Sequence, residues 1–202
     1  SASEGKIAYS GFDVAGFRIE LQPARIDPAK VDVDLGGIDQ AFHGGGFWKY
    51  HAIHHSSEDV DWISAARFHP VNLVLGTIGV DVVLLVAGIS PAVMLWLGPF
   101  NIFHSAFVHA NLNWDLGPFK YVIATPVFHR WHHTAREEGG DTNFAGTFPL
   151  WDLLFGTFRM PNECLPADYG IADQASFPSG MVQQWAYPFR WGQDTGGRIS
   201  RP

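Results

Sequence analysis

A long apolar stretch at residues 71–108 constrains the fold more than any other feature of this sequence. Val71 to Ile89 contains twelve Val, Leu or Ile among nineteen residues, and Pro91 to Val108 is apolar except at three positions. Each segment has about the length of a helix that crosses a bilayer core, roughly 20 residues. Ser90 and Pro91 provide a turn between the two segments. The stretch therefore predicts an apolar helical hairpin.

A hairpin of this kind suits either a membrane or the interior of a soluble all-α domain. Asp81 opposes insertion, because a carboxylate at the centre of a span costs roughly 2.5 to 3.5 kcal/mol. The aliphatic side chains return roughly 0.3 to 0.6 kcal/mol each, so the sum narrowly favours insertion. The stretch contains no Lys or Arg, but cationic side chains flank it on both sides, namely Lys49, Arg67, Lys120, Arg130 and Arg136. This pattern favours a membrane with both hairpin ends on the cytoplasmic side.

The rest of the chain divides around the hairpin. Residues 1–34 are polar and mixed, with no signal peptide or span and with short alternating pieces that suit strands, at Phe17, Ile19, Leu21 and at Val31, Val33, Leu35. Residues 35–158 carry the hairpin and the histidines, and residues 159–202 are rich in Pro and Gly and are expected to be irregular. The predicted fold is all-α, a membrane helical hairpin with a cytoplasmic-side helical cap rich in histidine.

Composition excludes several classes of protein. The net charge is −7 with no basic run, which argues against binding to nucleic acid. The single cysteine, Cys164, excludes an internal disulfide and a thiolate zinc site. Ten histidines are unusual beside only 13 Lys and Arg, and histidine is the commonest metal ligand.

Six of these histidines form a motif that occurs twice, His51-Ala52-Ile53-His54-His55 and His129-Arg130-Trp131-His132-His133. Positions i, i+3 and i+4 of a helix lie within about 100° of one another, so we expect each motif to aim three imidazoles at one place. Imidazoles packed together without a shared cation leave their nitrogens unpaired or mutually repelling. The repeated motif therefore predicts a metal site.

The number of imidazoles indicates two ions. With His43 upstream and His109 at the end of the hairpin there are eight, too many for one metal. Catalytic zinc uses three protein ligands, and the His-Glu-x-x-His motif of zinc proteases is missing from the sequence. Two irons held by imidazoles could activate dioxygen, which no side chain can do.

The motifs resemble those of the sterol desaturase and fatty acid hydroxylase superfamily, in the same order along the chain. The resemblance rests on six segments, Phe47–Glu58, Arg67–Pro70, His109–Asn111, Thr125–Thr134, Asp141–Phe144 and Trp151–Thr157. It implies an integral-membrane di-iron oxidoreductase that uses dioxygen, a lipid from the bilayer and electrons from an external donor such as a ferredoxin or a cytochrome b5 type protein. The implied substrates are sterols, fatty acyl chains, alkylglycerols or carotenoids. We expect hydroxylation, with desaturation as the runner-up.

The resemblance also implies the metal ligands, and we expect no catalytic side chain beyond them: His43, His51, His54, His55, His109, His129, His132 and His133. The sequence departs from the family at positions 39 and 40, where the family has histidine and arginine and this chain has Asp39 and Gln40. Asp39 could supply an oxygen ligand, or the site could be one ligand short. His104 is a further candidate, either a ligand or a buried hydrogen-bonding group.

Two rival functions are a metal-binding remnant of the family without oxygenase activity, which Asp39 would suit, and a zinc hydrolase on the same ligands. His69, before Pro70, is expected to fix the start of a helix or to support a ligand. Asp61, Asp141 and Asn143 either orient ligating imidazoles or cap surface turns.

Overall fold

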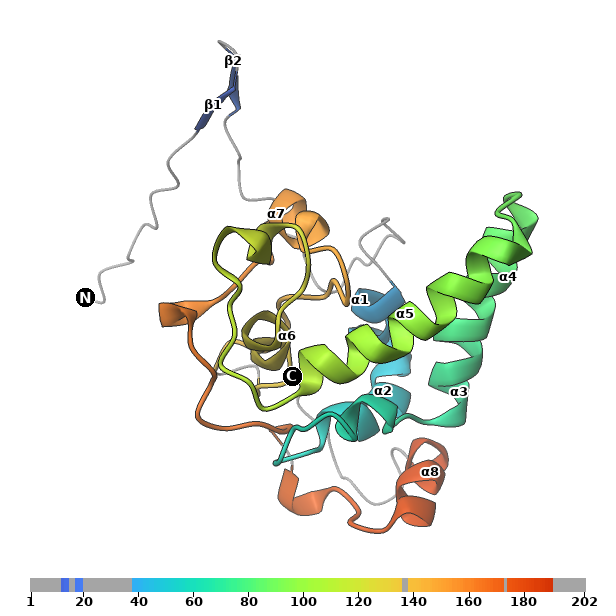
Figure 1. Ribbon diagram of the computed structural model, residues 1–202. Coiled ribbons are helices and arrows are strands. Elements are labelled where there is room, and N and C mark those ends of the chain that lie inside the picture. The colour runs from blue at the N-terminus through green and yellow to red at the C-terminus, as the bar shows by residue number, and fades with distance from the viewer. Residues whose placement is uncertain (1–11, 15–16, 20–37, 136–137, 173, 191–202) are drawn as a thin grey trace.

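The computed structural model describes residues 12–14, 17–19, 38–135, 138–172 and 174–190, and its body is helical (Figure 1). The strands among these residues are β1 (Phe12–Val14) and β2 (Phe17–Ile19), an antiparallel pair. β2 confirms the strand expected at Phe17 and Ile19, whereas positions 21, 31, 33 and 35 lie outside the described residues. The all-α prediction thus holds for the body of the protein.

The helices follow the predicted order: two helices of the histidine-rich cap come first, then the hairpin, and then the helix with the second histidine motif. Their bounds are α1 (Ile38–His43), α2 (Trp48–His55), α3 (Pro70–Asn72), α4 (Gly79–Val86), α5 (Pro91–His109), α6 (Pro126–His132), α7 (Leu150–Phe155) and α8 (Met181–Arg190). A π-helical segment, Leu73–Ile78, joins α3 to α4, so that residues 70–86 form one continuous arm. Short 3-10 turns occur at Gly45–Phe47, Ser64–Ala66, Gly117–Tyr121, Pro161–Glu163 and Gln174–Ser176.

Both arms of the hairpin begin with a side-chain cap followed by proline. The Nδ1 atom of His69 accepts a hydrogen bond from the Val71 amide at 3.0 Å, and Ser90 Oγ accepts one from the Ala92 amide at 3.2 Å. Proline suits the first helical position, because its nitrogen has no hydrogen to be satisfied there. The role expected for His69 at a helix start and the turn expected at residue 90 are both confirmed.

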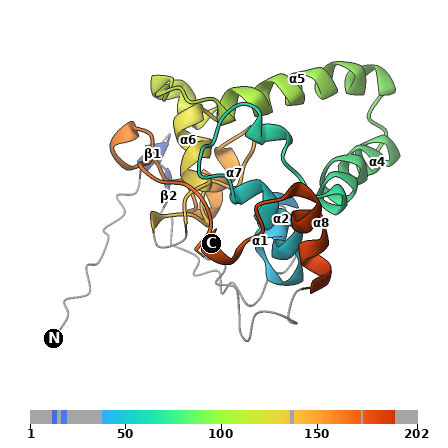
Figure 2. The same ribbon diagram turned by 90° about the horizontal axis from the view of Figure 1, so that it is seen from below.

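The hairpin is exposed rather than enclosed by the protein. Its arms meet at the tip and diverge toward the cap in both views (Figures 1 and 2). Val83, Val86, Leu95 and Trp96 are 65 to 84% exposed, and the apolar window of α5 is only 11% buried. The alternative of a hairpin buried inside a soluble domain is therefore wrong for the described residues. By length and composition, α5 is apolar enough to cross a membrane, and residues 70–86 form a shorter apolar helix.

The C-terminal segment packs against the cap, and it contains the helix α8 within the stretch expected to be irregular. Ile171 joins the buried cluster of Trp48 and Ala52. α8 contacts α2, and the carbonyl of Trp185 lies 3.1 Å from His69 Nε2. Pro188 lies inside α8, and a proline at such a position argues against a helix when only the sequence is considered.

The segment after α6 folds back through two buried polar side chains. Asp152 accepts hydrogen bonds from the amides of Phe144 and Ala145, both at 2.8 Å, and from the Thr157 hydroxyl at 2.5 Å. Asn143 has a left-handed backbone (φ 56°) and bonds the carbonyls of Phe128 and Arg159. These bonds hold residues 143–159 against α6.

We predict that Asp152→Ala destabilises the protein by about 3 kcal/mol, because it leaves two buried amides without an acceptor. The matched variant Thr157→Val removes one bond to the same carboxylate and should cost about 1 kcal/mol. Equilibrium unfolding of the full chain in detergent measures both. Equal stability of Asp152→Ala and the unaltered chain would contradict this account of the segment.

Candidate metal centre

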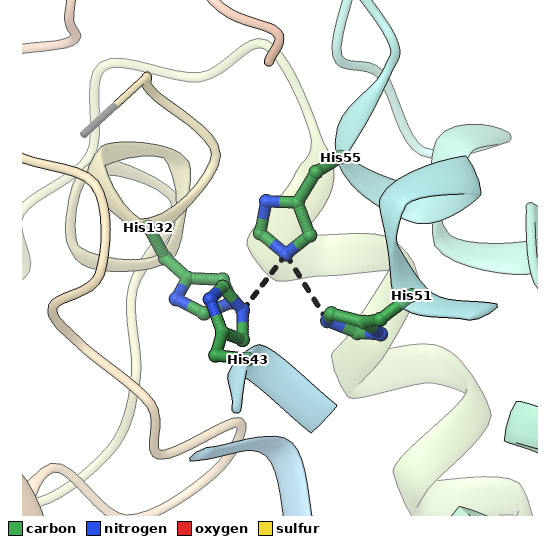
Figure 3. A group of neighbouring side chains, drawn as sticks. All are labelled: His43, His51, His55 and His132. Atoms are coloured by element: carbon green, nitrogen blue, oxygen red, sulfur yellow. Dashed lines mark hydrogen bonds between the residues drawn. The ribbon is translucent and has the colours of Figure 1, made fainter. Parts of the chain in front are cut away.

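The eight histidines expected to bind metal lie together in the interior of the cap, in two groups of four. The first group is His43, His51, His55 and His132, and its rings converge (Figure 3). The second group is His54, His109, His129 and His133. All eight side chains are buried, and His51, His55, His132 and His133 are among the largest fully buried residues.

In each group the rings meet through their Nε2 atoms. His55 Nε2 lies 3.1 Å from that of His43 and 3.1 Å from that of His51, and His43 Nε2 lies 3.2 Å from that of His132. In the second group His109 Nε2 lies 3.1 to 3.2 Å from its three partners. The groups adjoin, since the rings of His55 and His133 stack with their centroids 4.5 Å apart.

Each histidine motif is divided between the two groups, which corrects the expectation that a motif aims three imidazoles at one place. His51 and His55 of α2 belong to the first group while His54 belongs to the second. The motif of α6 is divided in the opposite sense, with His132 in the first group. Helix geometry explains the division, because positions i and i+4 lie about 40° apart, whereas i+3 is displaced by about 60° on the other side.

Three of the rings are fixed by partners on Nδ1. His132 Nδ1 donates to the Thr142 carbonyl at 2.8 Å, and His109 Nδ1 donates to the Ser105 carbonyl at 2.7 Å. His51 Nδ1 lies 2.7 Å from the Asn72 side-chain oxygen. A neutral imidazole has one N–H, so when neutral these rings would present a lone pair on Nε2 to the centre of their group. Asn72 was not predicted as a partner of His51, because no motif or spacing in the sequence relates the two residues.

The donor set fits two metal ions. Two imidazoles on one ion at about 2.1 Å lie about 3.0 Å apart at a right angle and about 3.4 Å apart at the tetrahedral angle. The Nε2 separations of 3.1 to 3.2 Å fall within this range. Without a cation, converging lone pairs would repel one another in a buried site.

Burial keeps most of the imidazoles neutral, which is the state that binds metal. Burial lowers the pKa of His43 to about 4. Burial, reinforced by the neighbouring imidazoles, holds the pKa of four others well below the ordinary range, namely His54, His55, His129 and His133. For His132, burial lowers the pKa, but the Asp39 carboxylate outweighs it, so this pKa is raised.

The remaining candidates have different surroundings. Asp39 lies against the first group, with Oδ2 3.0 Å from His132 Nε2. His104 belongs to neither group and stacks on Phe100 with ring centroids 5.5 Å apart. Of the three residues proposed to orient imidazoles, only Asp141 lies near one, 3.6 Å from His43 Nδ1.

Asn143 bonds backbone groups instead of an imidazole, and Asp61 caps a turn by accepting from the amides of Ile63 and Ser64. Two of the flanking cations are also structural. Arg130 is 3% exposed and donates to the His109 carbonyl at 3.0 Å, which ties α6 to the end of α5. Lys120 is buried and paired with Glu163.

We predict that the metal-free protein loses stability as the pH falls below about 6.5. The lowered pKa values mean that the folded state binds fewer protons than the unfolded state, so stability is present above the unfolded pKa and lost below it. A histidine whose pKa is about 4 in the folded state, such as His43, lowers the free energy of unfolding by about 2 kcal/mol at pH 5. His132, with its raised pKa, acts in the opposite sense but is one group against five.

Unfolding of the chelator-treated chain at pH 7.5 and pH 5 measures this loss. The double variant His54→Gln, His133→Gln removes two of the histidines whose pKa is lowered, so its stability should depend less steeply on pH. A stability independent of pH between these values would show that the imidazoles are not held neutral by burial.

Comparisons with known proteins agree with this geometry. The family described as fatty acid hydroxylase matches residues 39–157. The chain is 32% identical over 142 residues to ornithine lipid hydroxylase OlsE of Rhizobium tropici, a match that covers 70% of this chain and 42% of that protein. It is 34% identical over 116 residues to alkylglycerol monooxygenase of Homo sapiens, covering 57% of this chain and 26% of that protein. Methylsterol monooxygenase 1 of Rattus norvegicus is 30% identical over 125 residues, covering 59% and 41%.

The chain spans less than half the length of these relatives. No solved structure was found to match it. The family match begins at Asp39, includes all eight clustered histidines and covers more than half of the chain. The resemblance found from the sequence is thereby confirmed, and the chain belongs to the fatty acid hydroxylase family.

Proposed function

We propose that this chain forms the metal centre of a dioxygen-dependent, non-haem di-iron hydroxylase that acts on the hydrocarbon part of a membrane lipid. The observation that carries the proposal is the position of His109, which is the last residue of the apolar helix α5 and a member of the second histidine group. The exposed apolar surface of the hairpin and the buried imidazoles are therefore parts of one continuous structure. A lipid chain that follows α5 would arrive at the metal centre.

The donor set favours iron over structural zinc. Structural zinc sites use cysteine thiolates, alone or with histidine, whereas each group here consists of four imidazoles. Imidazole is a ligand that suits iron, and two adjoining groups provide for a pair of ions. Bound iron supplies the one-electron chemistry that dioxygen requires and that side chains lack.

The protein's own residues hold, orient and shield the ions. Eight Nε2 atoms provide the ligands, and the Asn72 side chain and the carbonyls of Thr142 and Ser105 fix three of the rings by their Nδ1 atoms. Burial of the rings excludes bulk water from the centre. Electrons must come from an external carrier, which we take to be a ferredoxin or a cytochrome b5 type protein.

We further propose that the hairpin spans a membrane with the cap on its cytoplasmic side. Lys49 of α2 and Arg67, three residues before α3, supply the positive charge that this orientation requires. Lys120 and Arg130 contribute less to this argument than the sequence suggests, because both are buried, Lys120 in an ion pair with Glu163 and Arg130 in a hydrogen bond to the His109 carbonyl.

The proposal predicts that membranes of a bacterium that makes ornithine lipids and expresses the full chain gain a hydroxylated lipid, with one oxygen atom derived from ¹⁸O₂. The purified chain should contain two irons. His51→Ala, in the first group, and His129→Ala, in the second, should each lose product and metal, because each removes a direct ligand. His104→Gln should retain both irons and the product, since His104 belongs to neither group.

Mass spectrometry of the lipids and metal analysis of the same preparations decide the outcome. A product that has lost two hydrogens without gaining oxygen would indicate desaturation. Bound iron without any lipid product, when a reducing carrier is supplied, would indicate a metal-binding remnant. Stoichiometric zinc from iron-replete cells would contradict the di-iron assignment.

The orientation predicts how cysteines react in intact cells. Cys164, the single cysteine, is half-buried in the segment that packs on the cap, so a membrane-impermeant maleimide should label it only after lysis. In the matched variant Ala87→Cys with Cys164→Ser, the new thiol at the exposed hairpin tip should be labelled in intact cells. Labelling of Cys164 before lysis would overturn the orientation.

A further inference from the structure

Asp39 places a carboxylate against three rings of one histidine group and against none of the other. It lies in the first turn of α1, four residues before His43. Its Oδ1 lies 3.3 Å from His51 Nε2, and its Oδ2 lies 3.0 Å from His132 Nε2 and 3.9 Å from His43 Nε2. Among the described residues, no carboxylate comes within 4 Å of the imidazoles of the second group.

The carboxylate approaches the same atoms that the first group would offer to a metal. The Nδ1 atoms of His132 and His51 have other partners, so their Nε2 atoms face the Asp39 carboxylate and the centre of the group. Asp39 Oδ2 is itself buried beside the Nε2 atoms of His132 and His43. A buried anionic oxygen about 3 Å from imidazole nitrogens is stabilised by a cation between them, either a metal ion or the proton of an imidazolium.

We infer that Asp39 is a fifth ligand of the ion held by the first group, so that the two ions are inequivalent. This inference rests on the proposed function, since it takes the two groups to be metal sites. The first ion has four imidazoles and one carboxylate, and the second has four imidazoles alone. The rings of both groups are buried, so the carboxylate is what distinguishes the two ions.

The two ions should consequently differ in how they are bound and lost. An anionic oxygen adds direct attraction for the cation and is a harder ligand than imidazole. Removal of a direct ligand should weaken the first site at least about tenfold, which is the lower bound for removal of an outer-shell partner. The second site should keep its affinity, because Asp39 does not contact its rings.

Metal titration of the full chain in detergent tests this inference, with Fe²⁺ under anaerobic conditions for affinity and Co²⁺ for its absorption spectrum. We expect the unaltered chain to bind two ions, and Asp39→Asn to bind one with unchanged affinity and the other at least about tenfold more weakly. Asp39→His should bind two ions with an altered Co²⁺ spectrum, because nitrogen replaces oxygen at one ion. The control Asp168→Asn changes an exposed carboxylate elsewhere and should match the unaltered chain.

Several results would overturn the inference. If both ions bind Asp39→Asn as tightly as the unaltered chain while the metal-free variant unfolds more easily, Asp39 serves only as an ion-pair partner of His132. If Asp39→His leaves the Co²⁺ spectrum unchanged, position 39 does not reach the ion, and this result stands even where Asp39→Asn fails to fold. Failure of the unaltered chain to bind metal would instead overturn the proposed function, so the two failures are distinguishable.

Discussion

The convergence of eight imidazole nitrogens in a buried space is the constraint on which the rest of this structure depends. Burial keeps most of the rings neutral, and a neutral ring whose N–H is on Nδ1 turns a lone pair toward the centre of its group. Such an arrangement is unfavourable in a low-dielectric interior unless cations occupy it. The centre is therefore a binding site and also the polar core that the helices must assemble around.

The helices of the cap are arranged to bring their histidines together, and the apolar core is correspondingly small. α2 and α6 each contribute to both groups, so neither group can form without contact between segments about 80 residues apart. Among the described residues few aliphatic side chains are buried, and the clusters they form are small, one with Ile171 and one around Phe128. Residues 143–159 and the C-terminal segment then cover the centre through hydrogen bonds to the backbone, such as Gly170 N to the His133 carbonyl.

The sequence was sufficient to predict the histidines that gather, the hairpin and its turn, because the histidine motifs, the apolar run and Ser90-Pro91 are local features and the family resemblance adds His43 and His109. The geometry of one helix explains why each motif divides, but which ring joins which group depends on how α2 and α6 face each other. Asn72 and the carbonyl of Thr142 carry no signal, because any acceptor in the right place can hold an Nδ1–H. Asn143 was misread for the opposite reason, as its side chain suited an imidazole but bonds backbone carbonyls.

The two groups also differ in which part of the chain they depend on. The first takes its ligands from α1, α2 and α6, all within the cap, whereas the second includes His109 at the end of the apolar helix α5. Because Arg130 bonds the His109 carbonyl, a shift of α5 along its axis would act on α6 and on the second group together. The other arm of the hairpin acts on the first group, because Asn72 of α3 holds the His51 ring by its Nδ1 atom. Movements of the hairpin therefore reach both groups, the second through His109 of α5 and the first through Asn72 of α3.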